Sequence, residues 1–161
     1  MAGLDRFRDA QNFSYDGFAS ALDEVRTGRK NGHWIWYVFP QISGLGTSEN
    51  AQRFAIDGEM EAVQFLRDPE LRSRYLTIAQ AVADQLRLGR PLAALMGSDI
   101  DAKKLVSSLT LFAHVARKLY DTEGIDAYSS VANVADEILT VAATQGYPPC
   151  ARTLQSLRGT I

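Results

Sequence analysis

Residues 99–119 read DIDAKKLVSSLTLFAHVARKL, and this stretch decides the fold class. Its bulky apolar positions follow one another at steps of four, three, four and three residues: Leu105, Leu109, Phe112, Ala116 and Leu119. Such steps keep side chains on one face of an α-helix. The stretch therefore predicts a long amphipathic helix, opened by Asp99, that buries one face in a core.

Similar signals mark helices on either side of this stretch. Ser14 is expected to cap a helix that ends at Gly28, where a left-handed terminal residue is favoured. Asp68 followed by Pro69 is a cap and a favoured first helical residue, so we expect a second long helix from there to Gly89. Further helices are expected at about 51–66, 91–96, 129–145 and 150–158.

One segment lacks a helical period. Residues 34–39 are apolar on every side and rich in β-branched and aromatic types, so periodicity does not separate a helical turn from an extended run. Pro40 ends the segment, because the residue before a proline is disfavoured in the helical region. We expect a short buried helix, since nothing else in the chain offers a partner strand. The sequence thus predicts an all-α fold, a single multihelical domain over residues 1–161 with about six to eight helices.

Composition narrows the classes of function. The 17 Lys+Arg against 19 Asp+Glu leave a net charge of −2, which argues against general nucleic-acid binding. Cys150 is the only cysteine beside two histidines, so neither an internal disulfide nor a Cys/His zinc site is expected, and no metal ligands are predicted. The charged start of the chain and the lack of a long apolar run predict no export signal, no membrane partner and a cytoplasmic location.

The first chemically suggestive feature is a locally basic segment. No acidic residue lies between Glu24 and Glu49, whereas Lys30 and His33 fall in this interval. Lys30 is expected to neutralise an anion. His33 is the candidate catalytic residue, a general acid or base, because imidazoles titrate near neutral pH. The alternative for His33 is a partly buried histidine that bonds to backbone.

Trp34, Trp36 and Gln41 lie within and just after the apolar segment. Either indole ring could stack on a planar group of a ligand, but at least one of them is expected to belong to the core. Gln41 offers both a donor and an acceptor to an amide edge. Its alternative role is to satisfy the backbone of a turn.

A glycine-bearing turn follows at residues 44–48. Gly44 and Gly46, with Ser48 beside them, could let backbone N–H groups converge on an anion at the start of the next helix. The alternative is an ordinary loop in which Thr47 or Ser48 caps that helix. The dinucleotide-binding fingerprint is incomplete, because Glu49 stands at its third glycine position.

A polar stripe accompanies the apolar stripe of the 99–119 helix. It consists of Lys104, Ser107, Ser108 and Thr110. Spacing of three and four residues places these groups on adjoining rows, so we expect them to line a polar pocket for an anion. The alternative is that the hydroxyls return to carbonyls one turn back and permit close helix packing.

The basic segment and the 99–119 helix also carry two long motifs. The first comprises Lys30, the run HWIWYVFPQ at 33–41, Gly44-Leu45-Gly46 and Ser48; the second is KLVSSLTLF at 104–112. Shorter patterns are Phe7 with Ala10-Gln11 and Tyr15, and Glu61-Ala62 with Phe65-Leu66 and Pro69.

Over about residues 4–120 this ordered set of motifs resembles the domain-of-unknown-function 1810 family of small bacterial and fungal proteins. The resemblance implies a single all-α multihelical domain and supplies no reaction, because the activity of the family is unassigned. Residues of about 125–161 are expected to form additional helices outside the resemblance.

The leading functional hypothesis is a pocket protein for a small anionic ligand, such as a nucleotide, a nucleoside derivative or a sugar phosphate. Lys30 and Lys104 would neutralise the anion, the hydroxyls would hydrogen-bond it, and His33 would serve a metal-independent hydrolysis. No cofactor is identified. The alternative is a non-catalytic helical module whose partner is another protein, bound in an exposed groove made by segment 34–39 and the C-terminal helices.

Overall fold

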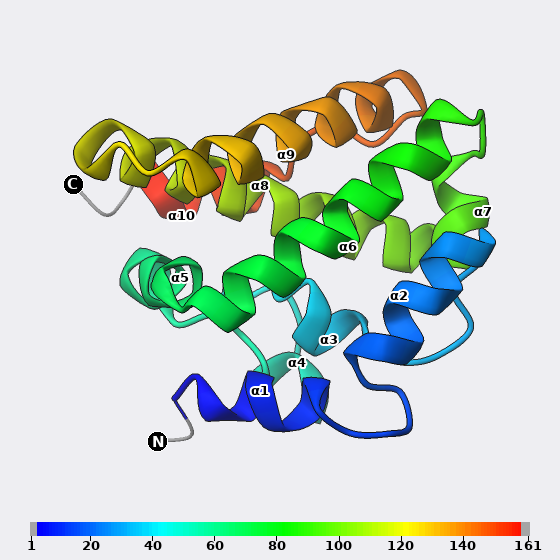
Figure 1. Ribbon diagram of the computed structural model, residues 1–161, viewed down its shortest axis with the longest axis horizontal. Helices are drawn as coiled ribbons and strands as arrows, with labels where there is room; N and C mark the ends of the chain where they lie inside the picture. The colour runs from blue at the N-terminus through cyan, green and yellow to red at the C-terminus, as the bar shows by residue number, and fades with distance from the viewer. Residues whose placement is uncertain (1–2, 159–161) are drawn as a thin grey trace.

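The computed structural model describes residues 3–158, which contain ten helices and no strand. The helices are α1 (Asp5–Gln11), α2 (Phe18–Thr27), α3 (Ile35–Val38), α4 (Glu49–Arg53), α5 (Gly58–Arg67), α6 (Pro69–Arg87), α7 (Leu92–Met96), α8 (Asp99–Glu123), α9 (Asp126–Thr144) and α10 (Ala151–Arg158) (Figure 1). The all-α prediction is confirmed, whereas the expected number of about six to eight helices is too low. Helix α1 was not expected, and the single helix expected at 51–66 is two helices, α4 and α5.

A hydrogen-bonded contact between distant segments breaks the expected 51–66 helix. Ile56 N donates to Gln41 O at 2.8 Å, and Ser43 N donates to Ile56 O at 2.9 Å. These bonds pair Ile42 with the fully buried Ile56 in an isolated parallel bridge. Because the backbone groups of Ile56 are used between segments, they cannot continue a helical ladder from α4 into α5.

Local signals predicted some helix ends correctly. Gly28 has a φ of +98° and closes α2, and the Asp68 carboxylate accepts a hydrogen bond from Leu71 N at 3.0 Å where α6 begins. The expected cap at Ser14 is wrong, because α2 begins at Phe18. Tyr15, which was expected on the apolar stripe of that helix, is 85% exposed, so it provides no burial to support a helical turn at Ser14.

Helix α8 begins one residue after its cap. The Ser98 hydroxyl accepts a hydrogen bond from Asp101 N at 3.0 Å, so Ser98 is the cap and Asp99 is the first helical residue. Serine and aspartate are both good caps, and Asp99 in the first turn also suits the positive end of the helix dipole. The predicted helix is therefore confirmed with its start where the sequence indicated.

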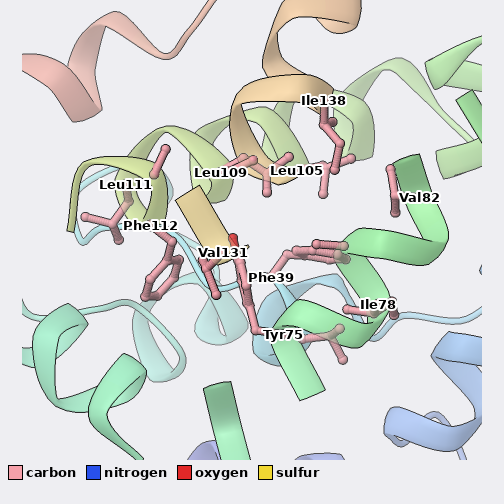
Figure 2. Close-up of a cluster of buried hydrophobic side chains, with 14 of the residues drawn as sticks. Phe39, Tyr75, Ile78, Val82, Leu105, Leu109, Leu111, Phe112, Val131 and Ile138 are labelled. Atoms are coloured by element: carbon pink, nitrogen blue, oxygen red, sulfur yellow. The ribbon is translucent and has the colours of Figure 1, made fainter. Parts of the chain in front are cut away.

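Helix α8 forms the centre of the fold. It contacts α9, α5, α7 and α10, and in Figure 1 it lies behind the diagonal α6. All five apolar positions of the predicted stripe are buried. Figure 2 shows three of them, Leu105, Leu109 and Phe112, in one cluster with side chains of α6 and α9: Tyr75, Ile78, Val82, Val131 and Ile138. Neighbours on several sides explain why α8 carries so wide an apolar face.

Aromatic rings join the N-terminal helices to α8. The ring centroids lie 5.3 Å apart for Phe7 and Phe65, 5.0 Å for Phe65 and Phe112, and 4.8 Å for Phe112 and Tyr75. Phe39, just after α3, meets Tyr75 edge-on at 5.3 Å. The short helix expected within residues 34–39 is thus confirmed as α3, held against the core by the ring that follows it.

Candidate functional site

A cavity of about 510 Å³ lies between the segment that follows α3 and the first turns of α8. Its walls come from α3 and residues 41–48, from α4 with the two residues after it, from α8, and from the residue before α10. The lining side chains and backbones are Trp36, Gln41, Ile42, Leu45, Gly46, Thr47, Ser48, Ala51, Phe54, Ala55, Ile100, Lys103, Lys104, Ser107 and Cys150. The bridge between Ile42 and Ile56 fastens the 41–48 segment in place and so shapes this cavity.

The cavity collects half of the residues that the sequence singled out. These are Trp36, Gln41, Gly46, Ser48, Lys104 and Ser107. The two long motifs therefore meet at one site, although 55 residues lie between Ser48, which ends the first motif, and Lys104, which begins the second. The other candidates lie outside the lining: Lys30, His33, Trp34, Gly44, Ser108 and Thr110.

Lys104 and Trp36 form the polar and aromatic corner of the cavity. The Lys104 ammonium lies 3.8 Å from the centroid of the Trp36 ring, which is a cation–π contact. Lys104 Nζ is also 3.6 Å from Asp101 Oδ1. Because the Lys104 side chain is largely withdrawn from solvent, these contacts hold its charge at the cavity wall.

Lys30 lies beneath this corner and does not reach the cavity. Its ammonium forms an ion pair with Asp101 Oδ2 at 2.7 Å, donates to the Gly32 carbonyl and lies 5.0 Å from the centroid of the Trp34 ring. Lys30 is 6% exposed. A buried ammonium with an acidic partner is already neutralised, so the geometry gives Lys30 a supporting role beneath Lys104.

His33 and Trp34 belong to the loop between α2 and α3 and lie outside the cavity lining. His33 is exposed, and its backbone N–H donates to Asp16 Oδ2 at 3.2 Å. Trp34 is fully buried, as expected for at least one of the two tryptophans, and its Nε1–H donates to Glu24 Oε1 at 2.9 Å. The predicted catalytic histidine therefore does not line the cavity.

Glu24 organises that loop. Its Oε1 accepts from Asn31 N at 2.7 Å and from Gly32 N at 2.9 Å, in addition to Trp34. Burial raises the pKa of this carboxyl, but the hydrogen bonds from Gly32, Asn31 and Trp34 outweigh it, and the net pKa lies below the usual value. One carboxylate thus folds the polar part of the first motif back onto α2.

The three hydroxyls of the α8 stripe have different environments. Ser108 is fully buried and its Oγ lies 2.9 Å from Tyr75 Oη. Thr110 donates to Val106 O at 2.7 Å, one turn back, which is the role that close helix packing predicts for a helical hydroxyl. Thr110 also lines a separate hollow of about 720 Å³. Only Ser107 reaches the candidate site.

The glycine turn closes one end of the cavity. Ser48 caps α4, and its hydroxyl accepts from Ala51 N at 3.1 Å. A Cβ added to Gly46 would lie 2.9 Å from the Ala51 Cβ, so glycine lets the turn pack closely on α4. Gly44 has a φ of +94° and lies outside the lining. The turn follows the ordinary capped-loop alternative and places four of its five residues, 45–48, at the cavity.

Cys150 is a lining residue that the sequence analysis did not assign to the site. Burial raises the pKa of its thiol, but hydrogen bonds from Thr153, Ser107 and the Arg152 backbone outweigh it, so the net pKa lies below the usual value. The backbone N–H of Cys150 also donates to Thr110 Oγ1 at 3.1 Å. No local signal could have placed Cys150 here, because 43 residues separate it from Ser107.

The charge of the lining is one-sided. Lys103 and Lys104 contribute two ammonium groups, and no aspartate or glutamate lies among the lining residues. Lys103 pairs with Asp99 at 3.3 Å, but both side chains are mostly exposed, so this ion pair is weak and easily exchanged. The cavity therefore favours an anionic or electron-rich occupant.

Residues 3–158 show neither a metal-binding cluster nor a membrane-spanning helix. No group of three or more His, Cys, Asp or Glu side chains in this range is arranged to hold a metal ion. Among the helices of the same range, none is long and apolar enough to cross a membrane.

Comparison with known families now places the chain. A family model described as protein of unknown function (DUF1810) matches residues 1–136. The chain belongs to the DUF1810 family. The match extends beyond the motifs into α9, further than the resemblance noted at about residues 4–120. Comparison with curated proteins gave no match.

A solved structure of similar fold supports this membership. The crystal structure of the conserved hypothetical protein Rv1873 from Mycobacterium tuberculosis has 33% sequence identity, a TM-score of 0.74 and an alignment that covers 96% of each chain. Coverage of 96% must include most of the segment after residue 125, so most of the C-terminal segment is shared with that protein. In this DUF1810 chain, the last helices carry Cys150 to the cavity.

Proposed function

We propose that this DUF1810 protein binds a small anionic ligand in the cavity between α3 and α8, with nucleotides, nucleoside derivatives and sugar phosphates as the ligand classes. The observation that carries the proposal is the lining: two lysine ammonium groups, no carboxylate and one tryptophan at the same wall. A cavity of about 510 Å³ has the size of ordinary small-molecule sites.

The chemical roles follow from the geometry of each side chain. Lys104 and the more exposed Lys103 attract the charged group, and Ser48, Gln41 and Ser107 supply hydrogen bonds around it. The apolar side chains Leu45, Phe54 and Ile100 contact an uncharged or planar part of the ligand. The proposal is one of binding; hydrolysis is left out, because His33 lies outside the cavity. A cytoplasmic location, argued from the sequence, is part of the proposal.

The alternative of a protein-binding module has less structural support. Its proposed groove needed segment 34–39 to be exposed, yet Trp34, Ile35, Val38 and Phe39 are buried in the core. Only Trp36 and Tyr37 of the segment are partly exposed, and Trp36 lines the cavity, so little of its apolar surface is free for a partner.

A thermal-shift panel tests the proposal. Inorganic phosphate, nucleoside mono- and diphosphates and sugar phosphates are added to the full chain, because a ligand that binds only the folded state raises the melting temperature. At a hundred times its dissociation constant, a ligand adds about 2.7 kcal/mol, or roughly 5–10 °C at this chain length.

Lys104→Ala and Lys118→Ala form the matched pair of variants. Both lysines lie on α8, but Lys118 pairs with Glu59 at 2.9 Å, away from the cavity. A ligand-induced shift that disappears in Lys104→Ala and persists in Lys118→Ala supports the cavity as the site. A panel without a shift, or an equal loss in both variants, contradicts it.

A further inference from the structure

A second, smaller cavity adjoins the candidate site. It measures about 250 Å³, and its lining residues are Lys103, Val106, Gly146, Tyr147, Pro148 and Cys150. Two of them, Lys103 and Cys150, also line the main cavity, so the two spaces meet at these side chains. We call the smaller space the annex.

The annex has mostly apolar walls. Val106 is a buried α8 residue, and Pro148 comes from the connector between α9 and α10. Tyr147 also lines the annex. Its hydroxyl donates to Asp99 Oδ1 at 2.6 Å, so the polar end of this side chain already has a partner. Lys103 is the only charged residue of the lining. The annex therefore suits an uncharged group that lies next to a positive charge.

The wall made by the connector is held in place from both ends. Tyr147 N donates to Ala142 O at 2.9 Å, and Cys150 N donates to Thr110 Oγ1 at 3.1 Å. Gln145 Oε1 accepts from Leu92 N at 2.7 Å, which ties the end of α9 to α7. The annex is thus a preformed space.

The size of the annex indicates how it is used. Small-molecule sites commonly occupy about 300–1,000 Å³, so the annex is small for a site of its own, whereas the main cavity is not. Its shared wall makes it an extension of the main cavity on the far side of Lys103. A ligand that fills both spaces places its charge at the boundary between them.

We propose, resting on the proposed function above, that the site takes an anion substituted on both sides, such as a phosphate diester, in preference to a terminal phosphate. The larger substituent lies in the main cavity beside Leu45 and Phe54, the charged group lies at Lys103 and Lys104, and a smaller apolar substituent enters the annex. A terminal phosphate monoester leaves the annex empty.

Two matched esters separate these ligand classes. Bis(4-nitrophenyl) phosphate is a diester with one negative charge, and 4-nitrophenyl phosphate is a monoester with more charge. Charge attraction alone favours the monoester. Tighter binding of the diester would therefore indicate that its second substituent occupies the annex. Calorimetric titration of the full chain is expected to show the diester binding about tenfold more tightly, because the second ring is removed from water.

Filling the annex is expected to remove this preference. Pro148→Trp places a large ring at the exposed side of the annex, and Val106→Phe fills it from α8. Pro149→Trp is the matched control, because Pro149 is the next residue in the chain and lines the separate hollow beside α9. Diester affinity is expected to fall about tenfold in the first two variants and to persist in the control, with monoester affinity unchanged throughout.

The outcomes distinguish this inference from the proposed function. The annex proposal is contradicted if the diester binds no more tightly than the monoester, or if Pro148→Trp and Pro149→Trp have equal effects. In either case, measurable monoester binding still supports the main cavity as an anion site. Binding of neither ester, with no shift in the thermal panel, overturns both. If Val106→Phe fails to fold, Pro148→Trp carries the test, because the proline is exposed.

Discussion

The Lys30 ammonium and the Asp101 carboxylate lie 2.7 Å apart beneath the candidate site, with side-chain exposures of 5% and 18%. The other oxygen of Asp101 faces Lys104 at 3.6 Å. One carboxylate therefore links a buried lysine of the first motif to the cavity lysine of the second. Asp101 is thus a direct polar connection between the two motifs.

Lys30→Met is expected to destabilise the fold. Removing the ammonium leaves the Asp101 carboxylate largely buried with only the longer contact to Lys104, so we expect a loss of about 2–4 kcal/mol in the free energy of unfolding. Urea denaturation measures the loss. Lys103→Met is the control, because its ion pair with Asp99 is exposed and contributes little. Equal free energies of unfolding for the two variants would show that the buried ion pair stabilises the fold no more than the exposed one.

Asp101→Asn is expected to separate stability from binding. The neutral side chain no longer competes for Lys104, so anion affinity should rise about three- to tenfold. The free energy of unfolding should fall, since Lys30 then lacks its acidic partner. Titration with 4-nitrophenyl phosphate and urea denaturation give the two readouts. Weaker anion binding in this variant would mean that Asp101 mainly positions Lys104.

Tyr75 and Ser108 are expected to act as one unit. Their hydroxyls lie 2.9 Å apart in the core, so Tyr75→Phe or Ser108→Ala alone leaves a buried hydroxyl without its partner. Each single change should cost about 1–3 kcal/mol, and the double variant should cost less than the sum. A urea-denaturation cycle checks this, and strict additivity would contradict a direct hydrogen bond.

Cys150 is expected to react as an activated thiol. Because its pKa lies below the usual value, more thiolate is present near neutral pH than in an unfolded chain, and iodoacetamide should modify the folded protein at lower pH. Ser107→Ala removes one hydrogen bond that lowers this pKa, so alkylation near pH 7 should slow about two- to fivefold. Mass spectrometry across pH measures the rate. A pH profile identical to that of the urea-unfolded chain would refute the lowered pKa.

Glu24 is expected to contribute an acid-sensitive part of the stability. Its folded-state pKa lies below the ordinary value of 4.5, so its contribution is fully present above that value and is lost as pH falls through the lower folded pKa. Glu24→Gln should lower the free energy of unfolding by about 1–3 kcal/mol at neutral pH. Thermal melts at several pH values should show the gap from the unchanged protein narrowing in acid. A gap that is constant with pH would exclude this role.

Several elements could be predicted from the sequence because their signals are local. The 4-3-4-3 spacing in α8 specifies one helical face, and all of its residues are buried in the structure. Asp68 with Pro69 and the left-handed Gly28 mark helix ends through bonds within a few residues. These signals do not depend on the rest of the chain.

Other predictions failed because the deciding partner is distant in sequence. The break between α4 and α5 depends on Ile56 bonding to Gln41, and α1 is fixed partly by Phe7 packing on Phe65. The apolar spacing within residues 51–66 does not indicate that Ile56 bonds to Gln41 or that Phe65 packs on Phe7. The break between α4 and α5 and the position of α1 therefore depend on tertiary hydrogen bonds and ring packing.

The residues of the candidate site likewise fall into those that the sequence predicted and those that only the tertiary structure placed. The sequence alone determined the all-α class, the central helix and the two motifs in which Trp36, Gln41, Ser48, Lys104 and Ser107 lie. Only the tertiary structure decided that Lys30 is neutralised by Asp101, that His33 lies outside the cavity lining and that Cys150 completes the wall. The physical reason is that residue type and spacing specify local conformation, whereas burial and charge partners arise when distant segments pack together.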